Sequence, residues 1–120
     1  MPQIAILIVE DESLIALGLA LAAEDAGALV VGPVATVSDA LALLQNGGID
    51  AAVIDANLLD GIVTPVAIML AAQAVPFVMH TATGMPDALD EVLADVPVIM
   101  KPARPEHVVQ TLIGALRRPA

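Results

Sequence analysis

Cysteine, tryptophan and tyrosine are absent from this chain of 120 residues, and phenylalanine occurs only once. Without cysteine, disulfide bonds, thiolate nucleophiles and cysteine-based metal sites are all excluded. Hydrophobic residues nevertheless make up 58% of the chain, so its core has to be built from alanine, valine, leucine and isoleucine. A chain of this length can bury such a core, and we expect a single domain over residues 1–120.

Positive charge is also scarce. Four lysine and arginine residues stand against 14 aspartate and glutamate residues, which gives a formal net charge of −10 at pH 7. Binding to nucleic acid or to anionic lipid needs clustered cations, so we predict no nucleic-acid partner and no membrane surface. No apolar run approaches the ~20 residues that span a bilayer, and Met1-Pro2-Gln3 lacks the basic start of a signal peptide. These absences predict a cytoplasmic protein.

Short apolar runs alternate with longer helical patterns along the chain. The runs predict five strands, over Ile4–Val9, Leu29–Val31, Ala51–Ile54, Val75–His80 and Val96–Met100. The other segments predict five helices, over Leu14–Ala26, Ser38–Gln45, Thr64–Ala74, Pro86–Ala94 and Pro105–Leu116. Strands that are apolar throughout are typical of a parallel sheet buried on both faces. The sequence therefore predicts an α/β fold, a doubly wound five-stranded parallel sheet with helices on both faces.

Local signals predict where these elements begin and end. Gly27 is expected to stop the first helix as a C-terminal cap, and Gly32-Pro33 is expected to break the second strand. Ser38 is expected to cap the second helix, and Thr64-Pro65 has the pattern of a cap followed by proline that begins a helix. Residues 55–61 are expected to form a loop.

The only lysine of the chain, Lys101, directly follows the last predicted strand. Acidic residues follow two other strands in the same way, Glu10-Asp11 after the first and Asp55 after the third, and Thr81 follows the fourth. The carboxyl ends of parallel strands meet at one edge of a sheet, where the ligands of such folds gather. We therefore expect these side chains to lie together.

As a group, these residues suit phosphoryl chemistry. Neighbouring carboxylates repel each other unless a cation intervenes, and Mg²⁺ prefers oxygen ligands that a substrate phosphate can complete. A carboxylate such as Asp55 can attack phosphorus and form an aspartyl phosphate, whose oxygens then need positive charge and hydrogen-bond donors. Lys101 and Thr81 supply both. The alternative for Glu10-Asp11-Glu12 is a simple cap at the positive end of the first helix.

Four short segments occur in the order and at the spacing of a known family. They are Val9-Glu10-Asp11-Glu12, Val53-Ile54-Asp55, His80-Thr81-Ala82 and Met100-Lys101-Pro102. By these segments the chain resembles, over its whole length, the receiver domain of bacterial response regulators. The Asp-x-Asn-Leu loop after the third strand and the pair Pro76-Phe77 are similar to a subset of stand-alone, single-domain receivers. The resemblance implies a flavodoxin-like strand order, 2-1-3-4-5.

The resemblance implies a phosphorylation site and a metal site. Asp55 would be the phosphoacceptor. The cofactor would be Mg²⁺, held by Glu10, Asp11 and Asp55, with Asp11 in the more direct contact. The backbone carbonyl of Asn57 would complete the protein ligands.

The resemblance also implies which groups act on the phosphoryl group and which partners take part. Thr81 and Lys101 would hold the phosphoryl oxygens, whereas Asn57 and Thr83 occupy positions that tune dephosphorylation. The donor would be a histidine kinase or a phosphotransfer protein, and the output would be binding to an unknown downstream protein. Such a domain is not classed as an enzyme, although it would catalyse its own phosphorylation and dephosphorylation. It would be a monomer or a weak dimer.

Several residues differ from the family's usual pattern and keep alternatives open. Val98 stands where an aromatic switch residue is common, and Ala103 stands where phenylalanine usually follows Lys-Pro. One alternative is therefore a degenerate receiver that binds partners without phosphorylation. Another is an aspartyl-phosphate phosphohydrolase, although haloacid-dehalogenase-type phosphatases carry their paired acids late in the chain. His80 is expected to be a partly buried histidine beside the site rather than a second catalytic group.

Overall fold

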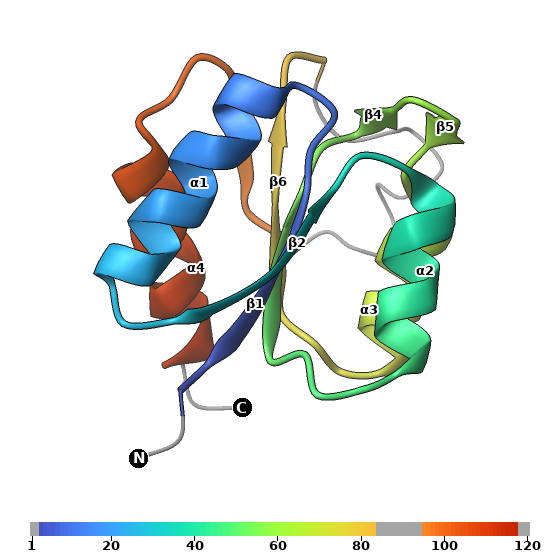
Figure 1. The fold of residues 1–120 in the computed structure, drawn as a ribbon, viewed down its shortest axis with the longest axis horizontal. Coiled ribbons are helices and arrows are strands. Elements are labelled where there is room, and N and C mark those ends of the chain that lie inside the picture. The colour runs from blue at the N-terminus through green and yellow to red at the C-terminus, as the bar shows by residue number, and fades with distance from the viewer. Residues whose placement is uncertain (1–2, 84–94, 118–120) are drawn as a thin grey trace.

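Five parallel strands form the central sheet of the computed structural model, which describes residues 3–83 and 95–117 (Figure 1). Their bounds are β1 (Ala5–Val9), β2 (Leu29–Val34), β3 (Ala51–Ile54), β6 (Phe77–Thr81) and β7 (Val98–Met100). The order across the sheet is β2-β1-β3-β6-β7, and every neighbouring pair is parallel. This is the order 2-1-3-4-5 when the strands of the sheet are counted along the chain, so the predicted fold is confirmed.

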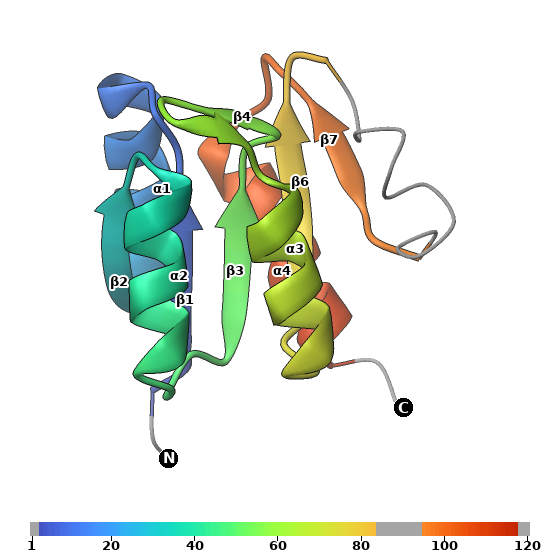
Figure 2. The same ribbon diagram turned by 90° about the vertical axis from the view of Figure 1, so that its right-hand side faces the viewer.

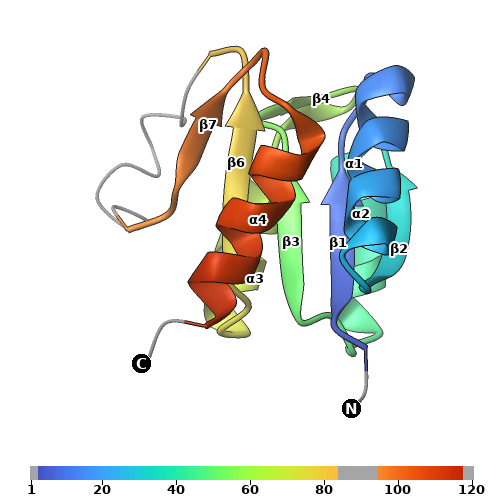
Figure 3. The same ribbon diagram turned by 90° about the vertical axis from the view of Figure 1, so that its left-hand side faces the viewer.

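Helices cover both faces of the sheet (Figures 1 and 3). The pair α1 (Ser13–Asp25) and α4 (Pro105–Leu116) lies on one face, and the pair α2 (Val37–Gln45) and α3 (Thr64–Ala72) lies on the other. The helix predicted over Pro86–Ala94 falls outside the described residues. Among the residues that are described, no helix combines the length and the apolar character needed to cross a bilayer.

The core is divided by the sheet into two aliphatic layers. Because side chains alternate along a strand, Ile6 and Ile8 of β1 pack with α1 and α4, whereas Leu7 and Val9 pack with α2 and α3. The three central strands β1, β3 and β6 are buried along their full length, while the edge strands β2 and β7 are partly exposed. The prediction of strands buried on both faces is therefore confirmed for the central three.

Glycine ends α1 as predicted, but a different residue from the predicted one caps α2. Gly27 has a positive φ of 88°. Its N–H donates to the Glu24 carbonyl (2.9 Å), and the N–H of Ala28 donates to the Ala23 carbonyl (3.0 Å). At α2 the prediction of Ser38 is wrong. Thr36 precedes the helix, and its Oγ1 accepts a hydrogen bond of 3.1 Å from the N–H of Asp39. Ser38 already lies in the first turn.

The strand β2 continues through the predicted break at Gly32-Pro33 and ends at Val34. The pairing with β1 shifts register there: Leu7 lies opposite Val31, but Val9 lies opposite Val34. Gly32 makes this possible with a positive φ of 92°. A Cβ atom on Gly32 would lie 2.9 Å from the Val34 nitrogen and 3.1 Å from the Ile8 oxygen, which are both backbone atoms that cannot move aside.

Gly32→Ala is therefore expected to lower the free energy of unfolding by about 2–3 kcal/mol, from the backbone conformation and from the clash. Gly47→Ala is the matched control, because Gly47 also has a positive φ (75°) but a Cβ there would meet nothing within 4 Å. The control should lose only about 1 kcal/mol. Urea denaturation of both variants measures the difference, and equal losses would show that the contact with β1 does not constrain Gly32.

A short hairpin occupies the segment after β3 that was expected to be a loop. Its strands β4 (Asn57–Leu58) and β5 (Gly61–Ile62) pair antiparallel, and strands of two residues are too short to leave a periodic signal in the sequence. The hairpin is fixed to the start of α2, because the Asp60 carboxylate accepts hydrogen bonds from the N–H groups of Val37 (2.6 Å) and Ser38 (3.1 Å). These bonds hold the pKa of Asp60 below its ordinary value.

Further predicted boundaries are corrected by one or two residues, and β7, for example, begins at Val98 rather than Val96. Thr64 begins α3 as its first residue rather than as its cap, which is Val63, and the helix ends at Ala72 rather than Ala74. β6 begins at Phe77 instead of Val75 and includes Thr81. Proline at position 76 has no N–H to donate to a neighbouring strand, which is consistent with the later start.

Candidate functional site

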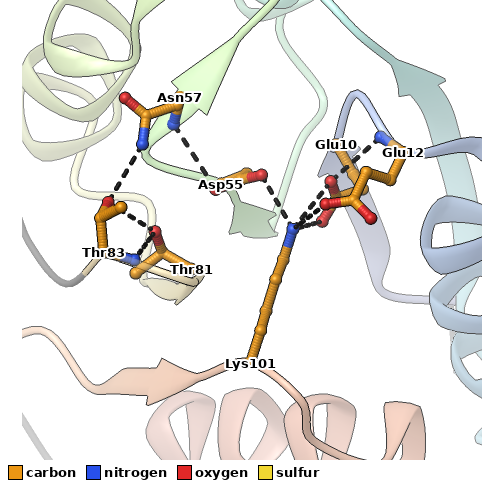
Figure 4. A network of polar contacts seen from close by, with 7 residues as sticks. All are labelled: Glu10, Glu12, Asp55, Asn57, Thr81, Thr83 and Lys101. Atoms are coloured by element: carbon orange, nitrogen blue, oxygen red, sulfur yellow. Dashed lines mark hydrogen bonds and ion pairs between the residues drawn. The ribbon is translucent and has the colours of Figure 1, made fainter.

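Four strands of the sheet have their carboxyl ends at the same edge (Figure 2), and the residues there bring acidic, hydroxyl and ammonium groups together (Figure 4). Glu10 follows β1, Asp55 follows β3, Thr81 ends β6 and Lys101 follows β7. Residues that lie far apart in the sequence therefore meet because all four strands run in the same direction and end together. The convergence predicted from the sequence is confirmed.

Lys101 is the centre of an ion-pair cluster. Its Nζ donates to an oxygen of Glu10 (3.1 Å), of Asp55 (3.0 Å) and of Glu12 (3.2 Å). The side chains of Glu10 and Asp55 are only 1% and 7% exposed, whereas that of Glu12 is 62% exposed. Because exposed ion pairs add little to stability, Lys101 acts chiefly as the counterion of the two buried carboxylates.

Three carboxylates form a group that could hold a cation. Glu10, Asp11 and Asp55 each offer an oxygen, and these oxygens lie within 4.8 Å of one another. Oε2 of Glu10 accepts hydrogen bonds from Lys101 Nζ and from the Glu12 N–H, and the buried Oε1, which accepts no hydrogen bond from any described residue, lies 3.1 Å from the same Nζ. A set of hard oxygen donors is the chemistry that suits Mg²⁺.

Glu12 contributes to this site in a way that the sequence did not reveal. It precedes α1, but its side chain makes no capping hydrogen bond, and the first turn of α1 contains no acidic residue. The alternative of a simple helix cap for Glu10-Asp11-Glu12 is therefore not supported. No spacing in the sequence distinguishes Glu12 from a surface acid, because its contact with Lys101 joins residues 89 positions apart.

The proton affinities at the site follow from burial and charge. Burial raises the pKa of Glu10 to about 7, and the neighbouring charge of Asp55 adds to the rise, against the hydrogen bonds from the Glu12 N–H and Lys101. For Lys101, burial favours the neutral amine. The hydrogen bonds and charges of Asp55 and Glu10 outweigh that effect and raise the pKa of Lys101 above its ordinary value.

The raised pKa of Glu10 predicts how the stability of the metal-free protein depends on pH. Since the carboxyl titrates near 4.5 when unfolded and near 7 when folded, the folded protein binds more protons between these values, and stability falls as pH rises through that range. Glu10→Gln removes this loss. Relative to the wild type, the free energy of unfolding of this variant should rise by on the order of 1–3 kcal/mol between pH 4.5 and pH 7.

Urea denaturation in the presence of EDTA across this pH range measures the gain. Glu106→Gln, which removes an exposed acid in α4, is the control and should follow the wild type at every pH. A constant difference between Glu10→Gln and the wild type would contradict the raised pKa.

Hydroxyl groups form a second network on the other side of Asp55 (Figure 4). Asn57 donates from Nδ2 to Thr83 Oγ1 (3.0 Å), and the hydroxyls of Thr81 and Thr83 lie 3.3 Å apart. The Thr83 N–H also donates to Thr81 Oγ1 (3.2 Å). Asn57 and Thr83 are therefore in direct contact, and Thr83 connects the pair to the buried Thr81.

His80 lies beside the site on β6 and is more deeply buried than predicted, with 3% exposure. Burial, followed by the charge of Lys101, lowers its pKa.

Val98 on the edge strand β7 is 39% exposed. The peptide bond from Lys101 to Pro102 is cis.

At the carboxyl edge of this fold, the buried acid Asp55 is paired with an ammonium and grouped with two further carboxylates. The family model "Response regulator receiver domain" matches residues 6–113, and the chain belongs to this family. The resemblance seen in the sequence is confirmed. The chain is thus a receiver domain of a response regulator, a class of signalling module in two-component systems. The family assignment sets the phosphohydrolase alternative aside.

Solved structures agree with this assignment. The solution structure of SdrG from Sphingomonas melonis Fr1 is 44% identical, with a TM-score of 0.79, and the match covers 97% of this chain and 98% of that one. The solution structure of the BeF3-activated conformation of SdrG from Pseudomonas melonis Fr1 is 45% identical, with a TM-score of 0.73 and coverages of 97% and 99%.

A CheY-like receiver domain protein from Methanospirillum hungatei JF-1 shares the fold at 24% identity, with a TM-score of 0.83 and coverages of 96% and 94%. No curated protein matches the chain.

Proposed function

We propose that this domain receives a phosphoryl group on Asp55 from a histidine kinase or a phosphotransfer protein, with Mg²⁺ as cofactor, and passes the signal on by binding another protein. The observation that carries the proposal is the position of Asp55. Its carboxylate is nearly buried, 3.0 Å from the Lys101 ammonium, and is one of three carboxylates that lie within reach of a single cation.

The transfer forms one bond and breaks another. An oxygen of Asp55 attacks the phosphorus of a phosphohistidine, the phosphorus–nitrogen bond breaks, and the imidazole nitrogen of the donor keeps the electron pair. Lys101 Nζ donates a hydrogen bond to Asp55 Oδ2 before the transfer. After the transfer it donates to an oxygen of the phosphoryl group. Thr81 donates its hydroxyl to another oxygen once its contact with Thr83 has been given up.

Glu10, Asp11, Asp55 and the backbone carbonyl of Asn57 would hold Mg²⁺. When bound, the ion supplies positive charge that neutralises the phosphoryl oxygens and the carboxylates. Asn57 and Thr83 stand where they can alter access of water to the phosphoryl group, and we assign to this pair the tuning of dephosphorylation. The BeF3-activated conformation determined for SdrG, which is 45% identical, supports the same type of activation here, since BeF₃⁻ mimics a phosphoryl group.

Intact-mass spectrometry after incubation with Mg²⁺ and acetyl phosphate tests the proposal. The wild type should gain one phosphoryl group, located by fragmentation to the peptide that contains Asp55, and EDTA should prevent the gain. If neither acetyl phosphate nor a phosphorylated histidine donor modifies the protein, the degenerate receiver becomes the better interpretation. The exposed Val98, in place of an aromatic residue, is the observation that favours that second candidate.

A further inference from the structure

A cavity that the phosphoacceptor chemistry does not use lies between the start of α1 and the connection from β7 to α4. Its volume is about 510 Å³, which is within the range of pockets that bind small molecules. Its walls are mostly apolar and include Ile15 and Leu19 of α1 and Ala103. The side chain at position 103 is a single methyl group, so little fills the space between the two elements.

His80 is the buried polar group of this cavity. Val78 of the same strand packs in the core layer of α1 and α4, and alternation along β6 places His80 on the same side. The residue is only 3% exposed, and neither ring nitrogen has a hydrogen-bond partner among the described residues. A buried polar group without a partner is unfavourable, so a ligand that bonds to His80 would gain affinity from it.

The surroundings restrict the charge of such a ligand. Lys101 lines the cavity but already donates to three carboxylates. Glu12 lies at the rim, and the chain carries a net charge of −10. An anion would therefore be repelled. A neutral imidazole offers one donor and one acceptor, and a hydroxyl group can satisfy either.

We propose that this cavity binds a small uncharged ligand that has an apolar ring and one hydroxyl group, a phenol or an aromatic alcohol. The ring contacts the aliphatic walls, and the hydroxyl forms a hydrogen bond with a ring nitrogen of His80. The cavity adjoins the phosphoacceptor cluster through Lys101 and Glu12, but binding of the ligand does not depend on the proposed transfer to Asp55, since the ligand contacts come from His80 and the apolar lining.

Titration with 4-methylphenol, followed by ¹H–¹⁵N correlation spectra, tests the proposal, with toluene as the matched probe that lacks only the hydroxyl. Wild-type amide signals around the cavity should shift and saturate with 4-methylphenol, and the affinity should exceed that for toluene by roughly tenfold, the effect of one hydrogen bond. 4-Hydroxybenzoate, which has the same ring with a negative charge, should bind more weakly than 4-methylphenol.

Two variants separate the contributions of the hydrogen bond and of the space. His80→Leu should lower the affinity for 4-methylphenol by roughly tenfold and leave toluene within about twofold. Ala103→Phe fills the cavity from the surface and should abolish the binding of both probes, while its spectrum shows a folded protein. If His80→Leu does not fold, the affinities of the wild type and of Ala103→Phe for the two probes still test the proposal.

Three results would overturn the proposal: no saturable shifts in the wild type, equal affinity for 4-methylphenol and toluene, or undiminished binding to Ala103→Phe.

Discussion

Asp55→Asn is expected to abolish the phosphoryl adduct completely under conditions that modify the wild type. Asparagine keeps the size and shape of the side chain and can still accept a hydrogen bond from Lys101 Nζ, which lies 3.0 Å from Asp55. Its amide, however, is not a nucleophile toward phosphorus. The loss would therefore report on chemistry rather than on the loss of the fold, and intact-mass spectrometry with acetyl phosphate and Mg²⁺ measures it.

Asp95→Asn is the control for the change in charge. Asp95 is exposed and lies beside Pro97 at the opposite end of the sheet from Asp55. This variant should be modified like the wild type. A phosphoryl adduct on Asp55→Asn of the same size as on the wild type would place the modified residue elsewhere and refute the assignment of Asp55.

The parts of the fold that could be predicted from the sequence are those where one physical signal dominates. The central strands are apolar on both faces, and runs such as Ala51–Ile54 have no other place than the middle of a covered sheet. Once the strands are parallel, the polar residues that follow them must meet at one edge. The positions of Glu10, Asp55 and Lys101 follow from this alone.

Other features depend on contacts between distant segments and leave no local signal. The capping of α2 by Thr36, rather than by Ser38, accompanies two hydrogen bonds from the first turn to Asp60, which lies more than twenty residues further on. The β4–β5 hairpin is too short for periodicity, and the cavity above His80 exists because two elements far apart in the sequence leave space between them. Such features become visible only when the chain is folded.

Lys101→Met is expected to lower the free energy of unfolding of the metal-free protein by about 3 kcal/mol at neutral pH. Methionine keeps most of the apolar stem and removes only the ammonium, which lies 3.1 Å from Glu10 and 3.0 Å from Asp55. Two carboxylates with side chains 1% and 7% exposed then lose their counterion. Urea denaturation in EDTA at about pH 7.5, where the Glu10 carboxyl of the wild type, with a pKa of about 7, is mostly charged, measures the loss.

Arg104→Met is the matched control, because it also removes one positive charge, three residues along the chain. Arg104 is exposed and forms no ion pair with any described residue, so this variant should stay within about 0.5 kcal/mol of the wild type. If Lys101→Met is as stable as Arg104→Met, the buried carboxylates do not need the lysine.

Two conditions should restore stability to Lys101→Met if the lysine acts as a counterion. At about pH 5 the deficit should shrink, because burial already raises the pKa of Glu10 to about 7 and the loss of Lys101 raises it further, so this carboxyl becomes neutral. Saturating Mg²⁺ should also reduce the deficit, since Glu10, Asp11 and Asp55 can face a single cation. A deficit that neither acid nor Mg²⁺ changes would instead reflect lost packing. Lys101 and Mg²⁺ would then be alternative counterions for the same carboxylates, and with the ion bound the ammonium of Lys101 would be available for the phosphoryl group.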